Sequence, residues 1–111
     1  MGGSDAFIVL EDADLDHALH WAIWGRMYID GQTCVVAKRF IVVGGLADKF
    51  LAGLRVALVA LKPGDPMDEA TTLGPLSTEA ALVQLLKKVN GAVAKGAKLE
   101  LGGKRIARAG S

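Results

Sequence analysis

Cysteine is nearly absent from this chain of 111 residues, which has one, Cys34. A single cysteine excludes an internal disulfide framework and is typical of a reducing compartment. No basic segment precedes an apolar run at the start, so we expect no signal peptide. Charged residues or glycines interrupt every apolar stretch well short of the roughly 20 residues that span a bilayer. These absences predict a soluble, cytoplasmic protein.

Charge of one sign is lacking as well. The chain has 13 basic and 12 acidic residues, intermixed, for a net charge of +1. This balance argues against a nucleic acid or a membrane surface as partner. Prolines number only 3, while 51% of the residues are apolar, so the composition is that of a globular protein. The length predicts a single domain over residues 1–111.

Short apolar runs alternate with amphipathic segments along the chain. The runs predict strands and the amphipathic segments predict helices, with Gly and Pro marking most boundaries. Strands separated by helices pair in parallel, so the predicted fold class is α/β, a small three-stranded, mainly parallel sheet with flanking helices. The expected strands are 6–10, 38–43 and 97–101, and the expected helices are 15–28, 46–61 and 77–95.

The first predicted helix, capped by Asp12 or Asp14, is apolar nearly all round. One face carries aliphatic side chains for the sheet. The opposite face carries an aromatic stripe at helical spacing, which a small sheet cannot also cover. We therefore expect a homo-oligomer that uses four interface residues: Trp21, Trp24, Tyr28 and Ile29.

The single cysteine follows this helix, on a segment that begins with Gly31. Connections between a helix and a parallel strand often hold functional side chains, because the flanking elements position them rigidly. A lone cysteine is nevertheless more often a small buried apolar residue. Residue types and spacing therefore leave Cys34 open between a core position and a nucleophile.

Gly31-Gln32-Thr33-Cys34, followed by Lys38-Arg39-Phe40, resembles the nucleophile motif of NAD(P)-dependent aldehyde dehydrogenases. Gly2-Gly3-Ser4-Asp5-Ala6 resembles the residues after that family's catalytic glutamate. The similarity covers essentially residues 2–104 and is closest to the succinate-semialdehyde dehydrogenases. Further matching segments are 8–16, 47–50, 61–66 and 73–76.

The resemblance implies that Cys34 is the nucleophile, with its backbone N–H forming half of an oxyanion hole. The parent family uses NAD or NADP. Its general-base glutamate would lie just before Met1, and its cofactor-binding segments would also lie outside this chain. No Gly-x-Gly-x-x-Gly turn occurs in the sequence. We expect no cofactor site in this fragment, and no aldehyde oxidation by the fragment alone.

Several positions depart from the family pattern: residues 28–30, Val36, Gly44-Gly45 and the closing Ala109-Gly110-Ser111. They predict an excised, engineered portion of a catalytic domain. One alternative is an engineered structural or self-associating protein with no catalytic role. Another is an engineered cysteine hydrolase using His17 or His20 with Cys34. The two histidines alone are too few for a metal site, so we expect no metal.

Overall fold

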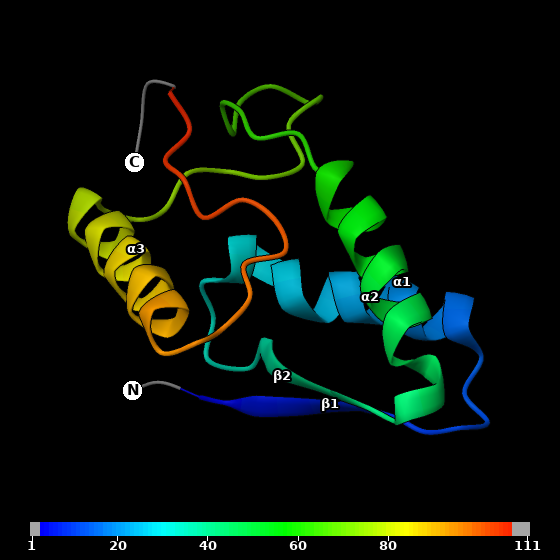
Figure 1. Ribbon diagram of the computed structural model, residues 1–111. Helices are drawn as coiled ribbons and strands as arrows, with labels where there is room; N and C mark the ends of the chain where they lie inside the picture. Colours follow the sequence, from blue (N-terminus) through cyan, green and yellow to red (C-terminus); the bar gives the residue numbers. More distant parts are fainter. Residues whose placement is uncertain (1–2, 108–111) are drawn as a thin grey trace. The chain divides into compact units, whose positions relative to one another are not determined.

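The computed structural model describes residues 3–107, so Met1, Gly2 and the closing Ala109-Gly110-Ser111 lie outside the described residues. The chain divides into two compact units, Met1–Lys62 and Pro63–Ser111. The first unit has five elements, and the second unit contains one helix (Figure 1). In chain order they are β1 (Asp5–Val9), α1 (Leu15–Met27), a 3-10 turn (Tyr28–Gly31), β2 (Ala37–Val42), α2 (Gly44–Val59) and, in the second unit, α3 (Glu79–Ala94).

The sheet of the first unit consists of two parallel strands, β1 (Asp5–Val9) and β2 (Ala37–Val42). Phe7 lies opposite Phe40 in the register, and their rings are 5.6 Å apart. Such cross-strand aromatic pairs stabilise a small sheet. The predicted α/β class and the parallel pairing of these two strands are confirmed.

Helix α1 (Leu15–Met27) begins where Asp14 accepts a hydrogen bond of 3.0 Å from the backbone N–H of His17, so Asp14 is its N-cap. Helix α2 (Gly44–Val59) follows β2 directly and begins at Gly44-Gly45, two residues before the predicted start of the helix at 46. The core of the unit joins both helices to the sheet through three buried side chains, Val9, Ala22 and Phe50.

The two helices approach closely at Gly53 of α2. A β-carbon at this position would overlap the end of the Leu19 side chain. Glycine at 53 therefore lets α1 and α2 pack with their axes near one another. This packing sets the position of α1, and with it the position of the segment that leads to Cys34.

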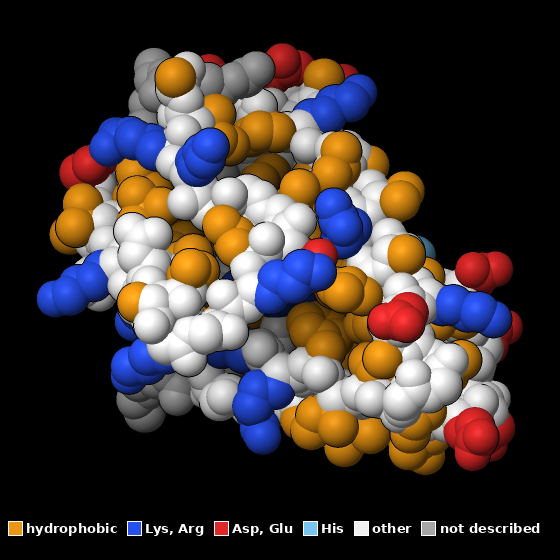
Figure 2. Space-filling model, viewed as in Figure 1, with side chains coloured by type: hydrophobic (Ala, Val, Ile, Leu, Met, Phe, Trp, Pro, Cys, Tyr) orange, Lys and Arg blue, Asp and Glu red, His pale blue; other side chains and the backbone are white. Residues whose placement is uncertain are grey.

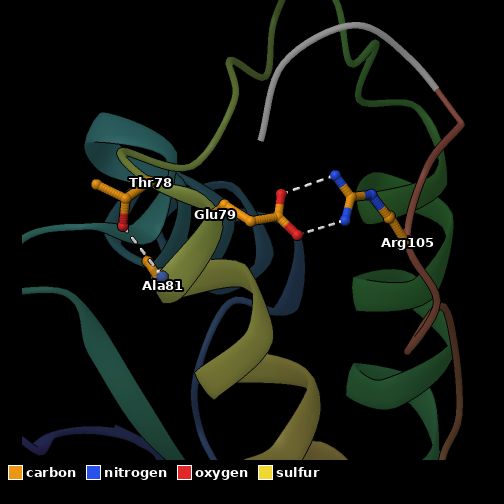
Figure 3. A network of polar contacts seen from close by, with 4 residues as sticks. All are labelled: Thr78, Glu79, Ala81 and Arg105. Carbon is orange, nitrogen blue, oxygen red and sulfur yellow. Dashed lines mark hydrogen bonds and ion pairs between the residues drawn. The ribbon is translucent and has the colours of Figure 1, made fainter.

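The second unit holds α3 (Glu79–Ala94), whose predicted position is confirmed within two residues. Thr78 caps it by accepting a hydrogen bond of 3.1 Å from the N–H of Ala81. Arg105 donates two hydrogen bonds, of 2.6 and 2.8 Å, to the carboxylate of Glu79 (Figure 3). These bonds lower the pKa of Glu79, and both side chains are solvent-exposed.

The predicted third strand is wrong. Residues 97–101 are irregular, and the described residues form a two-stranded sheet. A strand needs a neighbour for its N–H and C=O groups. In the described part of the second unit, the β-type pairing is an isolated bridge between Pro63 and Leu73, so no strand is available as a neighbour there.

Apolar side chains cover much of the visible surface, with acidic and basic side chains scattered between them (Figure 2). Of the helices within residues 3–107, none has the length and apolar character needed to cross a membrane.

Candidate functional site

Cys34 is exposed, on a turn between α1 and β2. Val36 and Ala37, which follow it, are buried and anchor the far side of the turn. Because β1 and β2 are parallel, the start of β2 lies beside the start of β1. Cys34 therefore lies near the end of the sheet at which both strands begin.

The chain enters this turn through a 3-10 segment, Tyr28–Gly31, with a backbone that is rare for side-chain-bearing residues. Ile29 and Asp30 have φ values of 48° and 55°, and Gly31 follows at 74°. Left-handed backbone is unfavourable for β-branched residues such as isoleucine. Arg26 donates to the carbonyl of Gly31 at 3.5 Å and so links the end of α1 to this segment.

Gly3, just before β1, contacts the Cys34 turn. A β-carbon on Gly3 would overlap the carbonyl oxygen of Cys34. Lys38 Nζ donates to the same carbonyl oxygen at 3.5 Å, and Arg39 Nε donates to the carbonyl of Ser4 at 2.9 Å. The backbone at Cys34 is therefore contacted by Gly3, in the segment that precedes β1, and by the side chain of Lys38, near the start of β2.

The sequence did not predict these roles of Gly3, Lys38 and Arg39. They depend on a bulge in the strand pairing: Asp5 pairs with Ala37 and Ala6 with Arg39, which leaves Lys38 without a register partner. No local residue pattern reports a bulge of this kind. The only sequence signal for Lys38 and Arg39 was the family motif, which includes both residues but does not indicate which groups they contact.

The two histidines lie on α1 with their rings against Trp21. The centroid distances to Trp21 are 6.2 Å for His17 and 5.2 Å for His20. These ring contacts give no support to a dyad with Cys34. Within residues 3–107, no three His, Cys, Asp or Glu side chains are grouped to hold a metal ion.

The predicted interface residues form one exposed aromatic face on α1 and its 3-10 extension. The ring centroids of Trp21 and Trp24 are 5.7 Å apart, and those of Trp24 and Tyr28 are 5.0 Å apart. The exposed fractions are 44% for Trp21, 54% for Trp24, 46% for Tyr28 and 60% for Ile29. Trp24 also lines an apolar groove of about 760 Å³ between α1 and α2.

A dinucleotide does not fit the first β-α connection of this chain. In dinucleotide-binding folds, a glycine-rich turn places the pyrophosphate on a helix N-terminus. Here the connection contains Glu11 and Asp12, and the Asp14 carboxylate occupies the N-terminus of α1. Negative charge at this position repels a phosphate.

Three known proteins show the extent of the similarity. A probable succinate-semialdehyde dehydrogenase (NADP(+)) of Synechocystis sp. is 46% identical over 111 residues, which are 100% of this chain and 24% of that protein. The solved structure of Gox0499 has a TM-score of 0.96 and 50% identity, over 98% of this chain and 24% of that one. The succinate-semialdehyde dehydrogenase of Burkholderia pseudomallei has a TM-score of 0.92 and 44% identity, over 96% of this chain and 22% of that one.

This chain therefore spans about a quarter of the length of the relatives that it matches. The profile of the aldehyde dehydrogenase family matches residues 1–111, from the first residue of the chain to the last. The parallel β-α-β unit, with its exposed cysteine turn, thus corresponds to one part of a larger enzyme fold. The chain belongs to the aldehyde dehydrogenase family.

Proposed function

We propose that this chain supplies the nucleophile-bearing segment of an NADP-dependent aldehyde dehydrogenase, with Cys34 as the nucleophile. The single observation that supports this most strongly is the exposed position of Cys34 on a turn held between two anchored elements. A small apolar residue serving the core would be buried. An exposed thiol on a rigid turn can reach an incoming carbonyl group.

The thiolate of Cys34 adds to the carbonyl carbon of the aldehyde. A carbon–sulfur bond forms, and the π electron pair of the carbonyl moves to its oxygen. The backbone N–H of Cys34 donates a hydrogen bond to this oxygen and stabilises its developing negative charge. Protonation of the oxygen completes a thiohemiacetal.

The later steps of the family reaction require groups outside the described residues. When bound, NAD or NADP would supply the hydride acceptor, and a general base would activate the water that hydrolyses the thioester. From the resemblance we infer that the base and the cofactor-binding segments are not among residues 1–111. We therefore expect residues 1–111 alone to give no NADP-dependent oxidation. The names of the relatives make succinate semialdehyde the proposed substrate of the complete protein.

The test places residues 1–111 in the Synechocystis relative, in exchange for the quarter of that protein that they match. We expect this chimera to reduce NADP with succinate semialdehyde. Cys34→Ser should lower kcat at least about a thousandfold, as expected for loss of a covalent nucleophile. Thr33→Ser, one residue away, is the matched control and should retain activity. An active Cys34→Ser chimera would refute the proposal.

A further inference from the structure

We infer that Lys38 and Arg39 are positioning residues that clamp the Cys34 turn to the segment preceding β1. The inference rests on the proposed function, because it concerns how the nucleophile is held. Arg39 binds the Ser4 carbonyl at 2.9 Å, and Lys38 binds the Cys34 carbonyl at 3.5 Å. The two bonds attach neighbouring side chains of β2 to two different segments of backbone.

The bulge makes this arrangement possible. Side chains of a regular strand alternate between the two faces of the sheet. Across the bulge the alternation fails, and Lys38 and Arg39 are both exposed, after the buried Ala37 and before the half-buried Phe40. Bulges often redirect side chains next to functional sites. Here the redirected side chains are the two that bind the carbonyls of Ser4 and Cys34.

Gly3 completes the clamp from the other side. Its Cα lies against the carbonyl oxygen that Lys38 binds, so this oxygen is contacted by both Gly3 and Lys38. Arg39 holds the residue next to Gly3 through the Ser4 carbonyl. The peptide that follows Cys34 is thereby restrained in orientation, and the direction of the thiol depends on the backbone at this residue.

The test measures the mobility of the turn in the full 111-residue chain by ¹⁵N relaxation. The Val35 amide shares its peptide with the Cys34 carbonyl, so it is measured together with the Cys34 amide. In the parent, both amides should have rigid order parameters of about 0.85, and in Arg39→Met both should fall below about 0.6. The amides of Phe7, Ile8 and Val9 should keep their values in both proteins. The Ser4 carbonyl ¹³C resonance should move in Arg39→Met, because that carbonyl loses its donor.

Two variants make the result specific. Lys49→Met removes one positive charge from an exposed position on α2 of the same unit and should change neither measurement. Arg39→Lys keeps a charged donor and should restore part of the order at Cys34. If Arg39→Met does not fold, Lys38→Met tests the other bond of the clamp by the same measurements.

An order parameter at Cys34 that is equal in the parent and the folded variant would overturn the inference, as would a parent turn that is already flexible. Neither result requires a substrate or a cofactor. The relaxation experiment can therefore contradict the clamp while the chimera still shows that Cys34 is essential. The opposite combination of results is equally distinguishable. A loss of global stability alone would lower the melting temperature without selectively mobilising Cys34 in the folded protein.

Discussion

Gly3 lies so close to the carbonyl oxygen of Cys34 that no side chain fits between them. Gly3→Ala should therefore displace the Cys34 turn and lower the free energy of unfolding by about 1–3 kcal/mol, as overpacking does in a close contact. Urea denaturation measures this change. Gly25→Ala is the matched control, because no neighbouring atom lies within 4 Å of a β-carbon there.

Alanine at position 25 should raise stability by about 0.5–1 kcal/mol, because glycine disfavours the interior of a helix. The two substitutions add the same methyl group, and we expect them to change the free energy of unfolding in opposite directions. A Gly3→Ala protein as stable as the parent would show that the contact between Gly3 and Cys34 is not tight in solution.

Ile29 adopts a left-handed backbone with φ 48° and ψ 50°, which asparagine tolerates far better than a β-branched residue. At a concentration where the chain is monomeric, Ile29→Asn should raise the free energy of unfolding by about 1 kcal/mol, since the side chain is mostly exposed in the single chain and little burial is lost. The same substitution at Ile41, an exposed position within β2, should be destabilising instead, because asparagine disfavours strands. A destabilised Ile29→Asn variant would contradict the strain at this position.

The aromatic face of α1 should mediate self-association, as its exposed rings have no covering element in the first unit. Trp24→Glu places a charge in the middle of the face and should shift the chain toward monomer in size-exclusion chromatography with light scattering. Burial of each aromatic side chain contributes on the order of 2–3 kcal/mol, so a few of them can outweigh the entropy of association. Met67→Glu, at an exposed position of the second unit, is the control and should leave the mass unchanged. A monomeric parent at about 100 μM, where micromolar association would already be evident, would refute this proposal.

Arg105 lowers the pKa of Glu79 from its ordinary value of 4.5, chiefly through their hydrogen bonds. A carboxyl group whose pKa is lower in the folded than in the unfolded chain stabilises the folded state at every pH above its unfolded-state pKa. This contribution is lost as the pH falls through the folded-state pKa. Arg105→Gln should therefore raise the pKa of Glu79 in a carboxyl ¹³C titration by NMR, and its stability should converge with that of the parent in acid.

The stability difference at neutral pH should be small, because solvent screens an exposed pair. Lys98→Gln is the control: Lys98 is 2.6 Å from the Glu100 carboxylate, and its loss should leave the Glu79 titration unchanged. An unaltered pKa of Glu79 in Arg105→Gln would show that the pair does not persist in solution.

Much of the helical structure was predictable, because helices are encoded locally. The apolar periodicity and the acidic cap predicted a helix over 15–28, and α1 is Leu15–Met27. The strand expected over 97–101 failed because local composition cannot show whether a partner strand is present. For the candidate site, the family motif singled out Cys34 as the proposed nucleophile. The Gly3 contact and the Lys38 bulge depend on the register of two strands far apart in sequence, and local spacing does not determine that register.

The most direct test of Cys34 as the nucleophile is the mass of the covalent intermediate. The chimera is mixed with NADP and succinate semialdehyde, quenched in acid and digested with trypsin, and residues 27–38 should form one peptide with a single cysteine. We predict the mass of a succinyl thioester on this peptide, and its absence from the Cys34→Ser protein. An active chimera whose acyl group is found on another peptide, or on none, would contradict the account.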